Sequence, residues 1–182
     1  MKYFWIILSC TSLILAEMPK ASQYKVELEI YLKAMYEHNF SMLEVYTTDE
    51  EKVEKGGDSI GFRTYLAQQS EALRATKSRI ADLAVKDAHS YVETEKYAFF
   101  LVEVDYVKMV YGRKFKLTHL FMGVSDVVSP YSWCFINTSK YGRAKMQQFY
   151  EELPMSLAQQ IRELPPQKIF NHKGDEITPN TI

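Results

Sequence analysis

Cysteine is scarce in this chain, which has only Cys10 and Cys134 among its 182 residues. Removal of a leader that contains Cys10 would leave one thiol, and one thiol cannot close an intramolecular bridge. The sequence therefore excludes a disulfide scaffold. Cys134 lies between Trp133 and Phe135 in a strand-like run, and we expect a buried, inert thiol there.

An excess of charge of either sign is also missing. Lysine and arginine together number 22, aspartate and glutamate 23, and the formal net charge is −1. A chain without a basic excess has little with which to neutralise phosphate groups. We therefore expect no nucleic acid partner.

The motifs that indicate a bound cofactor or metal do not occur. The sequence has no phosphate-binding loop, no Gly-x-Gly-x-x-Gly and no Gly-x-Ser-x-Gly. Its four histidines, His38, His89, His119 and His172, show neither the His-Glu-x-x-His pattern nor close pairing. We expect no cofactor and no metal.

The apolar run at the N-terminus is too short to span a membrane. It extends from Tyr3 to Ala16 after the positive Lys2 and turns polar at Glu17, whereas a spanning helix needs roughly 20 apolar residues. This pattern is typical of a secretory signal peptide over residues 1–16 that is cleaved after Ala16. The expected location is secreted or periplasmic.

A second interpretation of the same segment remains open. Residues 7–10, Ile-Leu-Ser-Cys, resemble a bacterial lipobox, in which Cys10 would be lipidated and become the mature N-terminus. Residues 11–16 stay apolar, where lipoproteins usually turn polar. A membrane partner is expected only if Cys10 carries a lipid.

Aromatic and aliphatic residues are plentiful: hydrophobic residues make up 47% of the chain and aromatic residues 14%, enough for a sizeable core. Helical spacing of apolar residues predicts a helix over 23–38, a short one capped by Ser41, and a longer one from Asp58 or Ser59 to about Lys77. The charged stretch 49–55 ends in Gly56-Gly57, and the two glycines indicate a loop.

The period of apolar residues changes from 3.6 to 2 near residue 78. Strands are predicted over 80–85, 91–92, 97–110, 114–124 and 131–137, followed by a helix over 144–152 and a loosely packed tail punctuated by prolines. Helices that precede an antiparallel meander predict the α+β class, with a strongly curved, cone-like sheet of about four strands. We expect one domain over 17–142 and a C-terminal helical tail over 143–182.

The predicted hairpin turn at Tyr111 and Gly112 fixes the pairing of the two long strands, because glycine accepts a positive φ. This pairing places a histidine among apolar and aromatic side chains on one face of the sheet. That group is Val102, Val104, Tyr106, Leu117, His119 and Phe121.

The opposite face of this hairpin mixes apolar and charged side chains. Glu103 and Asp105 lie two residues apart, with Lys114 and Lys116 on the other strand, which predicts a solvated set of cross-strand ion pairs. The apolar neighbours on that face leave room for partial cover by a second subunit. A homodimer is one expectation for the partner.

The order of elements resembles that of the nuclear transport factor 2-like superfamily, whose fold is a cone with a curved sheet and whose members include ketosteroid isomerase and small polyketide cyclases. Within this superfamily, the chain resembles an exported subgroup of unknown function. Residues 31–35 and 38–49 look like its opening pair of helices, and 62–73 like its third helix. Ser132-Trp133-Cys134-Phe135-Ile136-Asn137 looks like its last strand. Where the superfamily often has Gly-Asp at the helical break, this chain has His38-Asn39.

The resemblance implies a pocket on the concave side of the sheet, for which the candidate residues are Tyr31, Tyr106, His119, Phe121 and Trp133. In ketosteroid isomerase-like enzymes a tyrosine of the first helix donates to the substrate oxygen while a carboxylate moves the proton. The positions that match these roles here are Tyr31 and Glu54, and His119 is a further acid–base candidate.

Two functions follow as alternatives, because this superfamily hosts binding proteins and enzymes alike. The first is a non-catalytic exported domain that binds a small apolar ligand or a protein partner, or dimerises. The second is a cofactor-independent isomerase, cyclase or hydrolase that uses Tyr31, His119 and Glu54. The sequence leaves open whether the chain is an enzyme.

Overall fold

The structure, a computed structural model, describes residues 21–127, 132–163, 169–170 and 176–177. The predicted signal peptide, Cys10, His172 and the turn at residues 129–130 lie outside these ranges. The helices are α1 (Ala21–Glu37), α2 (Phe40–Tyr46), α3 (Asp49–Gly56), α4 (Ser59–Ala75), α5 (Thr138–Phe149) and α6 (Met155–Ala158). The strands are β1 (Arg79–Val85), β2 (His89–Glu93), β3 (Tyr97–Val110), β4 (Arg113–Asp126), β5 (Cys134–Asn137), β6 (Ile169–Phe170) and β7 (Glu176–Ile177).

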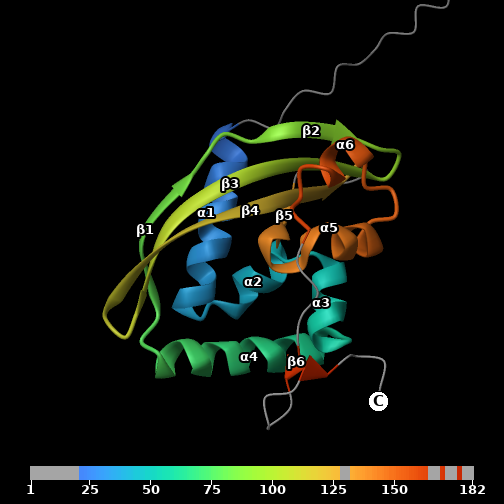
Figure 1. The fold of residues 1–182 in the computed structure, drawn as a ribbon. Coiled ribbons are helices and arrows are strands. Elements are labelled where there is room, and N and C mark those ends of the chain that lie inside the picture. Colours follow the sequence, from blue (N-terminus) through green and yellow to red (C-terminus); the bar gives the residue numbers. More distant parts are fainter. Residues whose placement is uncertain (1–20, 128–131, 164–168, 171–175, 178–182) are drawn as a thin grey trace, which may run out of the picture.

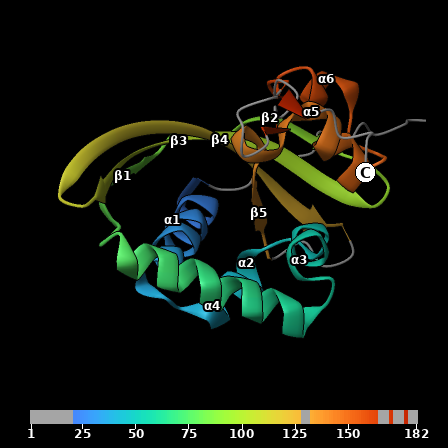
Figure 2. The same ribbon diagram turned by 60° about the horizontal axis from the view of Figure 1, so that its bottom comes forward.

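The main sheet is antiparallel and has five strands in the order β1-β3-β4-β5, with β2 also paired to β3. It curves strongly over α1, and α1 lies between the sheet and α4 (Figures 1 and 2). The α+β class and the curved antiparallel sheet are therefore confirmed, with one strand more than expected. The short strands β6 and β7 form a separate pair.

The hairpin of β3 and β4 has the predicted register throughout. Val104 pairs with His119, Tyr106 with Leu117, and Val110 with Arg113. The turn residues Tyr111 and Gly112 both have positive φ, 49° and 78°, which suits the twist of a two-residue hairpin turn.

The inner face of the sheet packs against the N-terminal helices. Large side chains of β3, β4 and β5 are buried there against α1, α2 and α4, and their apolar burial is the main stabilising contribution to this half of the molecule. The buried members are Tyr24, Leu28, Tyr31, Leu32, Ala34, Leu43, Phe62, Leu66, Ala98, Phe100, Val102, Val104, Tyr106, Phe121, Trp133 and Phe135.

The outer face of the sheet is covered by the chain's own C-terminal segment. Met146 of α5, Tyr150 directly after it and Leu157 of α6 are buried against β3, β4 and β5. The expectation of a loosely packed tail after the helix is wrong for residues 153–161, because the alternate residues of the long strands leave a second apolar face that this segment helps to bury. Along this part of the sheet the chain itself provides the cover expected of a second subunit.

The charged stretch 49–55, for which no helix is predicted from the sequence, lies in the helix α3. Thr48 caps it, since its Oγ1 accepts a hydrogen bond from the backbone N–H of Glu51 at 3.3 Å. Asp49, Glu50 and Glu51 form its first turn, where negative charge is favoured by the helix dipole. Gly57, with φ 74°, ends it.

Two further boundaries differ from the sequence prediction. The cap of α2 is Asn39, whose Oδ1 accepts from the N–H of Met42 at 3.3 Å, in place of Ser41. The helix expected over 144–152 begins at Thr138, directly after β5, and is broken at Gly142, whose φ is 74° and ψ 173°. A glycine accepts this conformation at little cost.

Candidate functional site

A partly enclosed cavity of about 170 Å³ lies between the first helices and the inner face of the sheet. Helices α1, α3 and α5 and strands β3, β4 and β5 all contribute to its wall. The residues that line it are Tyr31, Leu32, Met35, Tyr36, Glu51, Tyr106, Phe121, Asn137 and Lys140. Larger hollows elsewhere, of about 450 and 390 Å³, are more open to solvent.

Glu51 places a carboxyl group in the wall of this cavity, although only 7% of the residue is exposed. Its Oε1 accepts a hydrogen bond from the Tyr141 hydroxyl at 2.7 Å, and its Oε2 has no hydrogen-bond partner among the described residues. Burial raises the pKa of Glu51, while the bond from Tyr141 and the charges of Lys140 and Lys55 act in the opposite direction.

Helix α5 holds the α3 carboxylates in place. Besides the bond from Tyr141 to Glu51, the Tyr150 hydroxyl donates to Glu50 at 2.9 Å, and Lys145 forms an ion pair with Glu54 at 2.8 Å. The inward direction of the Glu51 side chain thus depends on a helix that follows it by about ninety residues.

The Tyr31 ring lies against Phe121 and Phe135, with ring centroids 6.5 and 6.1 Å away. Burial raises the pKa of its hydroxyl, and the nearby Glu51 carboxylate raises it further. Tyr31 therefore stays a neutral phenol, able to donate one hydrogen bond.

His119 lies behind the cavity wall and is bonded to two residues that line it. Its Nδ1 is 2.9 Å from the Tyr106 hydroxyl and 2.9 Å from Asn137 Nδ2. Burial lowers the pKa of His119 and keeps its ring neutral, and the tautomer of the ring sets whether Nδ1 donates or accepts in each of these two bonds. Burial and the neighbouring Tyr36 raise the pKa of Tyr106 to about 12.

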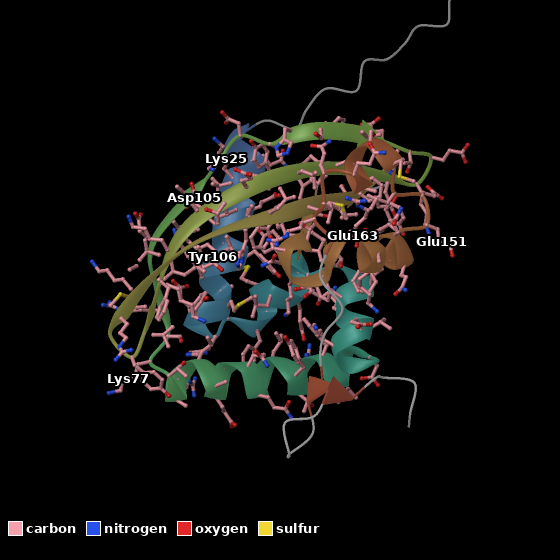
Figure 3. The ribbon with its side chains drawn as sticks, in the orientation of Figure 1. Lys25, Lys77, Asp105, Tyr106, Glu151 and Glu163 are labelled. Carbon is pink, nitrogen blue, oxygen red and sulfur yellow. The ribbon has the colours of Figure 1, made fainter. Side chains whose placement is uncertain are left out.

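Asn137 is the second group of the cavity with an unpaired oxygen. It ends β5, opposite Phe121, and while its Nδ2 faces His119, its buried Oδ1 has no hydrogen-bond partner among the described residues. Tyr106 projects from the sheet on the side of α1, and Asp105 projects from the opposite side (Figure 3). Glu51 and Asn137, whose side chains carry these two unpaired oxygens, therefore both line one cavity.

The structure brings together only some of the candidate residues. Tyr31, Tyr106 and Phe121 line the cavity, and His119 contacts it through Tyr106. Trp133 is not among the lining residues, since its ring packs against Phe100 and Tyr91 with centroids 4.7 and 6.5 Å away.

Glu54 also lies apart from the cavity, in its ion pair with Lys145. The carboxyl group that lines the wall is Glu51, three residues earlier, which sequence reasoning passed over within the charged stretch. The available signal was Thr48 three residues before Glu51, the spacing of a helix capping box.

The carboxylates of the outer face pair with a different cation from the one predicted. Lys86, between β1 and β2, lies 2.8 Å from Glu103 and 3.3 Å from Asp105, whereas Lys114 and Lys116 pair along the backbone with Met109 and Val107. All three ion-pair members are about half exposed, so these are solvated pairs of small energetic effect.

Cys134 is a free, half-buried thiol that donates to the carbonyl of Val45 at 3.5 Å. Burial raises the pKa of this thiol, which keeps it protonated and unreactive. Among residues 21–127 and 132–163 no three His, Cys, Asp or Glu side chains gather as metal ligands would. No helix in the described ranges has the length and apolar character to cross a membrane.

No protein-family model matches this chain, and no curated protein matches it significantly.

Proposed function

We propose that this chain is a non-catalytic binding domain whose ligand, a small and largely apolar molecule, occupies the cavity lined by Tyr31, Glu51 and Asn137. The observation that carries the proposal is that two residues lining one cavity, Glu51 and Asn137, each have a buried oxygen without a hydrogen-bond partner among the described residues. Most of the remaining wall is aliphatic or aromatic, as in typical ligand sites.

The free-energy cost of leaving these two oxygens unpaired favours a bound ligand that donates hydrogen bonds to them. A buried polar atom without a hydrogen bond costs about 1–3 kcal/mol, and more when it belongs to a charged group. A bound donor would recover that cost for each oxygen. A cavity of about 150 Å³ is known to hold a molecule as small as benzene, so the volume of about 170 Å³ suits a ligand of about six heavy atoms.

We also propose that the domain is exported and has a nuclear transport factor 2-like fold. The leader-like residues 1–16 support export, and the curved sheet over α1 supports the resemblance. Intact-mass measurement of the protein from its own host tests export: a chain that begins at Glu17 supports it, an added lipid on Cys10 supports the anchored form, and retained residues 1–16 contradict both.

Binding in the cavity is tested by nuclear magnetic resonance with 1-pentanol, a probe of the right size. Methyl resonances of Leu32 and Met35 should shift as the alcohol is added, while those of exposed methyl groups should not. The substitution Met35→Phe fills part of the cavity and should weaken binding at least tenfold. The same change at Met42, which is 40% exposed on α2, serves as the matched control and should leave binding intact.

If 1-pentanol instead shifts resonances over the whole surface of the wild-type protein, the proposal is contradicted, and no variant is needed to show this. Equal binding by Met35→Phe would contradict it as well. Native mass spectrometry of protein purified gently from its host then identifies the natural occupant as an added mass that Met35→Phe loses and Met42→Phe retains.

The enzyme alternative rests on Tyr31 and Glu51, a neutral phenol and a buried carboxyl on the same cavity. A phenol that polarises a carbonyl while a carboxylate removes a proton is the logic of a cofactor-independent isomerase. Incubation of the natural occupant with the protein in D₂O separates the two functions. An isomerase introduces deuterium into a carbon–hydrogen bond of the ligand, and Glu51→Gln stops this, whereas a binding domain returns the ligand unchanged.

A further inference from the structure

The unpaired groups of the cavity are both hydrogen-bond acceptors. Glu51 Oε2 and Asn137 Oδ1 are oxygens, so the polar end of an occupant has to donate hydrogen bonds to satisfy them. A hydroxyl donates one hydrogen bond, whereas a primary ammonium donates three. An occupant carboxylate would add acceptors where acceptors are already in excess.

The Glu51 carboxyl also lacks a counter-ion. No lysine, arginine or histidine of the described residues forms an ion pair with it. The two nearest lysines are directed at aromatic groups instead. Lys55 Nζ lies 4.9 Å from the centre of the Tyr141 ring, and Lys140 Nζ lies 3.5 Å from the Tyr65 hydroxyl.

The aromatic part of the wall suits a cation as well. Tyr31, Tyr36 and Tyr106 line the cavity with Phe121, and the face of an aromatic ring attracts an ammonium group. We propose, on the basis of the ligand-binding function above, that the cavity selects a small primary amine with a short apolar body, bound as its ammonium with Glu51 as the counter-ion.

Three probes that share a five-carbon chain test this choice: n-pentylamine, 1-pentanol and pentanoate, titrated by calorimetry at neutral pH. Pentylamine should bind at least tenfold more tightly than 1-pentanol, and pentanoate should bind most weakly. Hydrogen bonds to charged groups are about twice as strong as neutral ones, and one tenfold step corresponds to about 1.4 kcal/mol.

The matched variants are Glu51→Gln and Glu54→Gln, which remove a carboxylate from the same helix. Only Glu51→Gln should abolish the preference for the amine, because Glu54 is outside the cavity and pairs with Lys145. Lys140→Gln should strengthen amine binding, since it removes a like charge from the wall, and should leave 1-pentanol binding unchanged.

Each outcome decides between the two proposals. Absence of binding by all three probes refutes the ligand-binding function itself. Binding of 1-pentanol at least as tight as that of pentylamine leaves that function standing and overturns the choice of an amine, and so does a preference for pentanoate. The wild-type comparison is sufficient even if Glu51→Gln fails to fold.

Discussion

Replacing Gly123 with alanine should destabilise the protein by about 2 kcal/mol. A Cβ at this position would lie 2.4 and 2.5 Å from two ring carbons of Phe100, where carbon atoms normally approach to about 3.5–4.0 Å. The ring is fully buried, and its neighbours are Tyr24 and Trp133, with centroids 5.0 and 4.7 Å away, so it has no free direction in which to move.

The size of the loss follows from two opposing effects. Overpacking a filled core costs about 1–3 kcal/mol, and the upper part of this range applies because the overlap exceeds 1 Å. Replacing glycine in a strand returns about 0.5–1 kcal/mol through the lower entropy of the unfolded chain. In a chain of this length the net loss of about 2 kcal/mol lowers the melting temperature by about 4–8 °C.

Urea unfolding followed by far-UV circular dichroism measures the loss. The variant should show a lower midpoint with an unchanged slope, because the surface exposed on unfolding is the same. Phe100→Leu removes the ring carbons that the new Cβ would meet, and the double variant should be more stable than the sum of the single changes by at least about 1 kcal/mol. A Gly123→Ala variant within about 0.5 kcal/mol of wild type would refute the pairing of Phe100 with Gly123 across the sheet.

Two more predictions concern the tail and the site. Leu157→Ala should lower the free energy of unfolding by about 2–5 kcal/mol in the same urea assay, because Leu157 is fully buried. The control Met155→Ala, on the exposed side of α6, should lower it by less than about 0.5 kcal/mol. Equal losses for the two variants would contradict the packing of the tail. A buried carboxyl with a raised pKa ionises later in the folded state than in the unfolded state, so stability falls as pH rises from about 4.5 through the folded pKa. The free energy of unfolding of wild type relative to Glu51→Gln should therefore decrease over this interval, and an increase would contradict the burial of Glu51.

The hairpin of β3 and β4 was predictable because its signals are local. Alternation of residue types sets the two faces, and Gly112 fixes the turn, so the whole register follows from one position. The same reasoning placed Tyr106, His119 and Phe121 on the inner face, where the structure has them.

Helix α3 could not be recognised in the same way. Its only aliphatic side chain, Val53, is 61% exposed, so no apolar stripe marks the helix in the sequence. Its inward-facing residue is a carboxylate that a tyrosine of α5 holds, and no local pattern connects Glu51 with Tyr141.

The prolines around the tail predict loose packing, which residues 153–161 do not have. Pro154 instead precedes the first turn of α6, where its lack of a backbone donor does no harm. What decides the burial of Leu157 and Ile161 is the second apolar face of the sheet, which becomes visible only when both faces of the long strands are counted.

The hydrogen bonds from Tyr141 to Glu51 and from Tyr150 to Glu50 set an order of assembly during synthesis. Glu51 and Asn137 are both encoded by residue 137, but Lys140 of the cavity wall and the phenols that fasten α3 leave the ribosome afterwards. A nascent chain therefore completes the cavity wall only with its last helices, and a message truncated before codon 141 lacks the tyrosine that holds Glu51.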